Sequence, residues 1–383
     1  MTGMVFVFSF VILMHLMAIF TTQYFGFTKQ LSYEVVVYSS IDVFLSCLVV
    51  FFVLIRFKGF FKDAESSYKR TYSQFFEGHL VLLLVLVLIA AYQAYSSIGL
   101  ILSGIARHQL LQEYDRGGLL YMFTSGFFKM LVPIVFYFAS SKKVKFLAVI
   151  GLIFVVAITA SRSELKYVIN FYIILMLFSS SRNQIARVFA VVVVMIFFAI
   201  LSTIFLQNRP ISDGFFAVVD MAISVFQYRA YSYYLAEIPL QITDPIYKVM
   251  YPFFGYISEI FIRFSFGSIN AIDSEFVGYL HYLGSSPTTG RPYLANVLYP
   301  WWSWFVGVFG ITGLIIKAIY CYLLLAFLAS QKMLFTIIIL IAFVLLGTGG
   351  AHPLLTLTHV LAIFSCVIID LIVLLSHKYK LKV

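Results

Sequence analysis

Apolar runs of about 20 residues recur along the whole chain, and this is the length that an α-helix needs to cross the hydrocarbon core of a bilayer. The 383 residues are 62% hydrophobic and only 11% charged, whereas a soluble domain carries roughly 25% charged residues. The alternating pattern of about 10 residues typical of a membrane β-strand is absent from the sequence. We therefore expect an all-α polytopic membrane bundle of ten helices, at about 4–24, 34–56, 79–100, 119–140, 146–160, 165–179, 186–206, 301–328, 333–349 and 353–375.

Basic residues follow every second span, with one weaker case, which places both termini in the cytoplasm by the positive-inside rule. The first run, from Met4, has no basic segment before it and no small-residue cleavage site, and is interpreted as a retained helix. The basic residues that set this orientation are Arg56, Lys58, Lys62, Lys69, Arg70, Lys142, Lys143, Lys145, Arg182, Arg187, Lys332, Lys378, Lys380 and Lys382.

This orientation divides the chain into three parts. Residues 1–206 form an N-terminal seven-helix membrane part, 207–300 a long outer segment, and 301–383 a C-terminal three-helix membrane part. Two semi-apolar stretches within 214–266 are expected to lie in the outer interface or to re-enter the membrane part-way, because charged residues interrupt them. Trp301, Trp302 and Trp304 mark the outer rim of the next span, where tryptophan anchors.

The outer side is rich in arginine, although topology requires no positive charge there. Seven of the ten basic residues on that side are arginines: Arg107, Arg116, Arg162, Arg209, Arg229, Arg263 and Arg291. The planar guanidinium binds phosphate or carboxylate through two parallel hydrogen bonds, which lysine cannot do. The sequence therefore predicts an anionic ligand at the outer face. A polar cap that closes a helix hairpin is the alternative explanation for Arg162, within the turn SRSELK.

Short motifs in this layout carry a family resemblance. An apolar helix ends in Thr159-Ala-Ser-Arg-Ser163 and opens directly into another span, and a polar-then-helix segment runs from Thr288 to a GxxG-like turn at Gly307, Gly310 and Gly313. Together with the late outer segment and the many aromatic residues, these features resemble the oligosaccharide repeat-unit polymerases of O-antigen and capsule synthesis. An RX10G pattern from Arg107 to Gly118 is similar to one in some of these polymerases, although it falls in an earlier loop.

The resemblance implies a GT-C-like membrane glycosyltransferase of the bacterial inner membrane. Its substrates would be undecaprenyl-diphosphate-linked oligosaccharides, joined at the periplasmic face in contact with membrane lipid, with no cofactor and no nucleic acid. A chain-length regulator protein stays open as a further partner. Related O-antigen ligases carry a histidine before the GxxG turn, where this chain has Tyr293, Asn296 and Tyr299, and this difference counts against a ligase.

Under this resemblance, negative charge builds on the lipid diphosphate as the glycosidic bond breaks, and preplaced arginines stabilise it. The predicted diphosphate-binding residues are Arg162, Arg229, Arg263 and Arg291, with Arg107 secondary. The outer segments contain no DxD pair, so no metal site is predicted. The acceptor hydroxyl needs a base, for which His281 ranks first, Glu275 and Asp273 compete, and His352 is a second histidine candidate.

Four ionisable residues lie inside spans, where charges are costly. By their depth, we expect two structural ion pairs, Asp42 with Lys129 and Lys317 with Asp370. His15, among apolar residues, is interpreted as a packing residue. A proton relay through the charged residues would instead fit a flippase or other transporter, which is the main alternative function. A membrane acyltransferase is a third alternative, without its expected basic-and-histidine motif.

Overall fold

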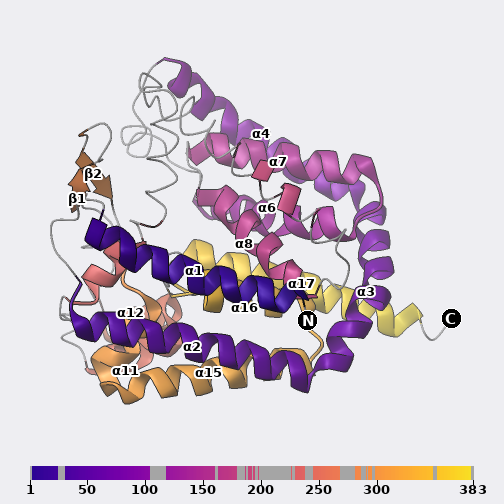
Figure 1. Ribbon diagram of the computed structural model, residues 1–383. Coiled ribbons are helices and arrows are strands. Elements are labelled where there is room, and N and C mark those ends of the chain that lie inside the picture. Colours follow the sequence, from indigo (N-terminus) through magenta and orange to yellow (C-terminus); the bar gives the residue numbers. More distant parts are fainter. Residues whose placement is uncertain are drawn as a thin grey trace.

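In a computed structural model the described part of the chain is almost entirely helical (Figure 1). The structure describes residues 2–24, 31–103, 118–159, 163–178, 229–237, 245–267, 281–285, 290, 292–295, 298–347 and 352–380, with isolated positions between 186 and 226. Only isolated helical positions of the predicted span 186–206 are among them.

The N-terminal part comprises seven described helices and a 3₁₀ turn. These are α1 (Thr2–Tyr24), α2 (Tyr33–Arg56), α3 (Lys58–Gly78), α4 (Leu80–Leu102), α6 (Gly118–Phe138), α7 (Lys142–Thr159) and α8 (Ser163–Leu175), which continues into η1 (Met176–Phe178). All except α3 match predicted spans to within a few residues. Helix α2 shows why such segments form: Ser32 caps its N-terminus by accepting the N–H of Val35, Glu34 lies in its first turn and Arg56 in its last, as the helix dipole favours.

Four described helices are long and apolar enough to cross a membrane: α1, α2, α4 and α15 (Thr312–Ser330). Shorter apolar helical stretches occur at Thr124–Phe138, Val168–Phe178, Leu334–Leu346 and His359–Leu375. On α15 the side chains of Ile315, Ile319, Leu323 and Phe327 are exposed at a spacing of four residues, a continuous apolar stripe suited to lipid. These features are those of an all-α membrane-embedded bundle.

The centre of the bundle is α16 (Leu334–Leu346), in which every residue except Val344 is buried. A helix that is apolar on all faces is one that other helices surround. Its N-terminus is capped from the neighbouring α17 (Leu357–Lys380), because the Asp370 carboxylate accepts the backbone N–H groups of Phe335 and Thr336 at 3.1 and 2.9 Å. Asp370 also accepts hydrogen bonds from the hydroxyls of Thr336 and Tyr72. The predicted pair of Asp370 with Lys317 is therefore wrong.

Helix α3 is an element that the span analysis missed, because it is polar on one face. It runs across the end of the bundle rather than along it (Figure 1). The buried Tyr72 attaches α3 to α17 through Asp370, and Ser73 and Glu77 bond the turn at Ser140 and Ser141. A helix with one polar face is typical of segments that lie along a membrane surface.

The predicted span 301–328 is two helices, α14 (Trp301–Phe309) and α15. Gly310 has a positive φ of 62°, and a Cβ atom on Gly313 would lie 2.3 Å from the carbonyl oxygen of Phe305. The two glycines thus allow a tight break that the apolar pattern does not reveal. The C-terminal part, predicted to hold three helices, contains α14, α15, α16 and α17.

The outer segment contains two short helices, α11 (Pro245–Phe254) and α12 (Tyr256–Phe266). With a rise of about 1.5 Å per residue, neither is long enough by itself to span a bilayer; whether they lie in the interface or re-enter the membrane stays a prediction. A two-stranded antiparallel hairpin, β1 (His281–Ser285) with β2 (Pro292–Ala295), was not predicted.

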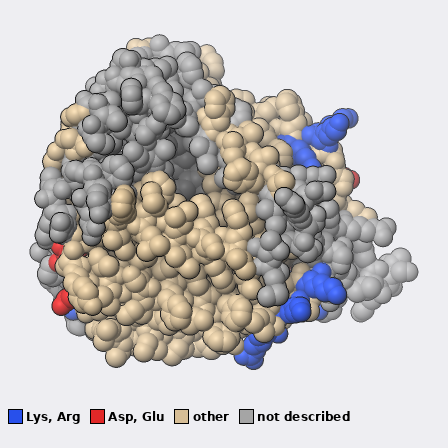
Figure 2. All heavy atoms as spheres, viewed as in Figure 1, with Lys and Arg blue, Asp and Glu red and all other residues tan. Residues whose placement is uncertain are grey.

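Both termini point toward one end of the bundle (Figure 1), and most of the visible lysine and arginine side chains gather at that end (Figure 2). Arg56 at the end of α2, Lys142 at the start of α7 and Lys332 between α15 and α16 are among the described basic residues there. On the visible face, a surface of described residues without charged side chains lies beside this end (Figure 2). This distribution matches a positive-inside arrangement.

Candidate functional site

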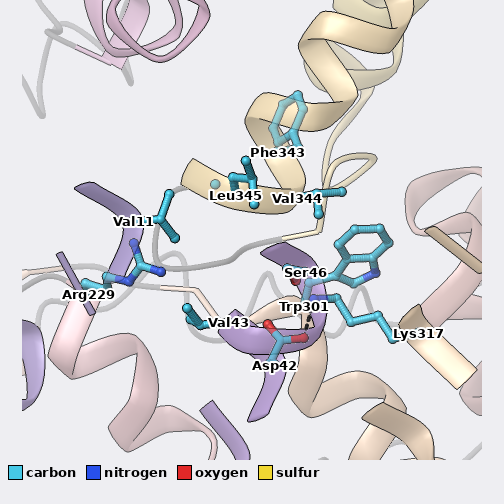
Figure 3. A pocket seen from close by; sticks show the side chains of 11 residues that line it. Val11, Asp42, Val43, Ser46, Arg229, Trp301, Lys317, Phe343, Val344 and Leu345 are labelled. Atoms are coloured by element: carbon cyan, nitrogen blue, oxygen red, sulfur yellow. Dashed lines mark hydrogen bonds and ion pairs between the residues drawn. The ribbon is translucent and has the colours of Figure 1, made fainter. Parts of the chain in front are cut away.

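A polar recess opens between helices from both membrane parts (Figure 3). Its cavity volume is about 20 Å³, which is room for about one water molecule. Three charged groups and one serine face it, and the other lining residues are mostly apolar. The polar recess is lined by Val11, Asp42, Val43, Ser46, Arg229, Trp301, Lys317, Phe343, Val344, Leu345 and Gly347.

Lys317 and Asp42 form an ion pair in this recess, with 2.5 Å between Nζ and Oδ1. The Lys317 Nζ atom also lies 5.1 Å from the Trp301 ring centroid, a cation–π distance. The pairing differs from the predicted Asp42–Lys129, and the reason is the break at Gly310. One continuous helix from Trp301 would place Lys317 at the depth of Asp370. In the structure, Lys317 lies only five residues beyond the start of α15.

Arg229 reaches the recess from the helical residues 229–235 of the outer segment. These residues are held in place at both ends. The Ser232 hydroxyl donates to the carbonyl oxygen of Leu298 at 2.7 Å, and Glu237 accepts the backbone N–H of Ser32 at 2.6 Å. The Arg229 guanidinium points toward Val11, across the recess from Trp301 and Lys317 (Figure 3).

The Nε atom of Arg229 donates to the Tyr233 hydroxyl at 3.1 Å. Among the described residues, no carboxylate lies within ion-pair distance of this guanidinium. Lys317 and Asp42 compensate each other, so the recess keeps one net positive charge from Arg229. A guanidinium held in partly dehydrated surroundings stabilises an anion more strongly than one in water does.

A second group of polar contacts fixes the break between α11 and α12. Because Gly255 interrupts the helix, the last backbone carbonyls of α11 lack N–H donors from a following turn and need other donors. The Pro252 carbonyl oxygen accepts from Trp301 Nε1 at 2.9 Å and from His352 at 3.1 Å, and the Phe253 carbonyl oxygen accepts from the Tyr320 hydroxyl at 2.7 Å. Trp301 thus connects this break to the recess.

His352 does not suit the role of a base, for which it was the second histidine candidate. Its Nδ1 accepts the N–H of Leu354 at 2.9 Å, so its Nε2 carries the proton and donates to Pro252. The side chain is 1% exposed, and burial lowers its pKa to about 3. Both ring nitrogens are committed to backbone groups, which is a structural role.

The other predicted site residues are placed as follows. Arg263 lies on α12 outside the recess lining, with its side chain 51% exposed and paired to Glu259 at 2.5 Å; burial raises the pKa of Glu259, against the attraction of Arg263. His281 begins β1, opposite Ala295. Asp273, Glu275, Arg107, Arg162 and Arg291 lie outside the described residues, so their roles stay predictions.

Sequence reasoning missed the part played by His15. Its apolar neighbours in the sequence predict a packing residue, but its Nδ1 lies 3.0 Å from the Tyr233 hydroxyl and its Nε2 lies 3.0 Å from the Ser40 hydroxyl. The signal was present, because an ionisable residue inside a span indicates function by default. Its partner, however, is 218 residues away in the chain.

Within the described part of the chain, no group of three or more His, Cys, Asp or Glu side chains is arranged to hold a metal ion. Comparison with protein-family models, curated proteins and solved structures finds no match to this chain.

Proposed function

We propose that this chain is an integral-membrane glycosyltransferase that polymerises undecaprenyl-diphosphate-linked oligosaccharide repeat units into a surface polysaccharide, O-antigen or capsule. The reaction takes place at the periplasmic face of the bacterial inner membrane and uses no metal. Support comes from the family resemblance of the motifs, and from a helical architecture suited to a membrane. The recess adds a chemical argument.

The observation that carries the proposal is Arg229, a cation without a carboxylate partner among the described residues, in a recess that it shares with the Asp42–Lys317 pair and with mostly apolar side chains. The leaving group of the transfer is a lipid diphosphate, whose negative charge grows as the glycosidic bond breaks. Arg229 stabilises that charge. In this proposal Arg162, Arg263, Arg291 and Arg107 are the further diphosphate-binding candidates, and His281, Glu275 or Asp273 takes the proton of the acceptor hydroxyl.

A gel of surface polysaccharide tests the proposal in cells that lack the chain. Complementing plasmids carry wild type, Arg229→Ala, Arg162→Ala, or Arg56→Ala as the matched control, since Arg56 donates to Tyr322 at the basic end of the bundle. A single-repeat band should replace the ladder in the deletion strain. Wild type and Arg56→Ala should restore the ladder. Arg229→Ala and Arg162→Ala should not restore it. An unchanged ladder in the deletion strain would overturn the proposal.

A lipid-linked oligosaccharide flippase is the second candidate, and one observation favours it. The breaks at Gly255 and Gly310 make discontinuous helices, which many transporters use at their substrate sites. The same gel separates the two functions. Loss of a flippase removes every surface glycan band and leaves lipid-linked repeats in the inner leaflet, whereas loss of a polymerase leaves single repeats on the surface.

A further inference from the structure

Arg229 is the first member of a chain of hydrogen bonds that crosses from the outer segment to α1 and α2. Its Nε donates to the Tyr233 hydroxyl at 3.1 Å, and that hydroxyl lies 3.0 Å from His15 Nδ1. His15 Nε2 lies 3.0 Å from the Ser40 hydroxyl, which donates to the Val36 carbonyl oxygen at 2.7 Å. Tyr233 and His15 are 2% and 4% exposed.

The two ends of this chain fix the direction of every bond in it. A guanidinium can only donate, and a carbonyl oxygen can only accept. Because Ser40 gives its proton to Val36, it accepts from His15 Nε2–H. The Nδ1 atom of the neutral ring is then free to accept the proton of Tyr233, whose oxygen in turn accepts from Arg229. All four hydrogen bonds are satisfied by one tautomer of His15.

The arrangement leaves the binding edge of Arg229 available. Tyr233 occupies only Nε, so the two terminal nitrogens stay free of this relay and can donate in parallel to a phosphate. A long arginine side chain loses considerable rotamer entropy when it is held for a ligand. A relay that fixes it beforehand removes part of that cost from binding.

We infer that His15 is a positioning residue for Arg229, acting through Tyr233 to hold the guanidinium for the diphosphate group of a lipid-linked ligand. The inference rests on the proposed function for the identity of the ligand. His15 itself does not touch the ligand. Its contribution is to keep the Tyr233 proton directed away from Arg229, so that the tyrosine oxygen accepts the Nε–H.

Binding of undecaprenyl diphosphate to the purified full-length protein in lipid nanodiscs tests this inference. His15→Leu and Ser40→Ala should each weaken binding, His15→Leu by about tenfold, the effect of losing one neutral hydrogen bond. His15→Asn should bind within roughly threefold of wild type, because its amide oxygen can replace Nδ1 as acceptor. Ser39→Ala is the matched control: Ser39 donates to the same Val36 carbonyl oxygen at 3.1 Å, but no hydrogen bond joins it to His15, Tyr233 or Arg229 among the described residues.

A double-mutant cycle separates positioning from folding. If His15 acts through Tyr233, His15→Leu combined with Tyr233→Phe should weaken binding no more than the worse single variant. Additive losses, unchanged binding by His15→Leu, or equal losses in Ser39→Ala and Ser40→Ala would each overturn the inference. Should His15→Leu fail to fold, the serine pair decides alone.

The binding assay tests the role of His15, and the polysaccharide gel tests the proposed polymerase, so either claim can be overturned without the other. A ladder that survives deletion of the chain removes the proposed polymerase, yet the ratio of the Ser40→Ala and Ser39→Ala affinities still reports on the relay. A wild-type protein that does not bind undecaprenyl diphosphate overturns the inference, whatever the ladder shows.

Discussion

At the scale of single residues, Gly255 is a position where no other residue fits. Its φ is +51°, and a Cβ atom there would lie 2.5 Å from the Leu354 carbonyl oxygen and 2.6 Å from His352 Nδ1. Gly267 has a φ of +94° but open space around it. Its substitution therefore costs only the backbone strain, about 1–2 kcal/mol, whereas Gly255 adds a clash with the backbone.

We expect Gly255→Ala to lower the thermal unfolding temperature of the purified protein clearly more than Gly267→Ala does. Intrinsic tryptophan fluorescence is a suitable signal, since Trp301 bonds the carbonyl of Pro252 beside the break. Equal losses in the two variants would contradict the close approach at Gly255.

The Asp42–Lys317 pair makes a second prediction at this scale. The two side chains are 15% and 4% exposed, so removing one partner leaves a buried charge and should destabilise by about 3–5 kcal/mol. Asp42→Asn together with Lys317→Met should cost clearly less than the sum of the single variants. Urea or thermal unfolding in detergent measures this coupling, and additive losses would show that the pair is not coupled.

Which charges would be buried could be predicted from their place inside apolar runs, but their partners could not. Depth counting assumed that helix 301–328 was continuous, and the break at Gly310 shifted Lys317 toward Asp42. His15 was overlooked for a related reason. No residue near His15 in α1 indicates that Tyr233 is its hydrogen-bond partner. Tyr233 lies in a segment whose sequence shows no clear span pattern.

At the scale of elements, the break between α11 and α12 is attached to the connection between α16 and α17 through His352. Burial lowers the pKa of His352 to about 3, whereas its value in an unfolded chain is 6.5. As pH falls below 6.5, the unfolded chain takes up a proton that the folded chain does not. The stabilisation is therefore fully present above pH 6.5 and is lost as pH falls toward 3.

We expect wild type to lose about 2 kcal/mol more stability than His352→Asn when pH falls from 7 to 5. Asparagine does not titrate, and its amide oxygen can still accept the N–H of Leu354. Unfolding temperatures of both proteins at the two pH values provide the comparison. Parallel pH profiles would mean that His352 titrates normally in the folded protein.

The apolar pattern predicted the position of most described apolar helices to within a few residues, because bilayer thickness sets the length of such runs. It missed the elements that the bilayer does not dictate. Helix α3 has too many polar residues to be predicted as a membrane span. Glycine is common in membrane helices, so Gly310 did not indicate that one helix ends there. The β1–β2 hairpin lies in the outer segment, for which the sequence pattern predicted only interfacial or re-entrant helices.

At the scale of the whole molecule, the basic end should face the cytoplasm and the β1–β2 hairpin the opposite side. Single-cysteine labelling tests this orientation after replacement of Cys47, Cys321 and Cys366. Tyr282 is 47% exposed on β1, so Tyr282→Cys should react with a membrane-impermeant maleimide in spheroplasts. Lys143→Cys, exposed at the start of α7, should react only after the membrane is permeabilised. The reverse pattern would invert the topology and place Arg229 on the cytoplasmic side.

The central claim is that the chain joins lipid-linked repeat units through a recess built around Arg229. Reconstitution tests it most directly: purified wild type and Arg229→Ala are added to undecaprenyl-diphosphate-linked single repeats extracted from cells that lack the chain. We predict that wild type produces a ladder of longer lipid-linked glycans and releases undecaprenyl diphosphate, and that Arg229→Ala does neither. A wild-type reaction in which the single repeats stay unchanged would contradict the claim.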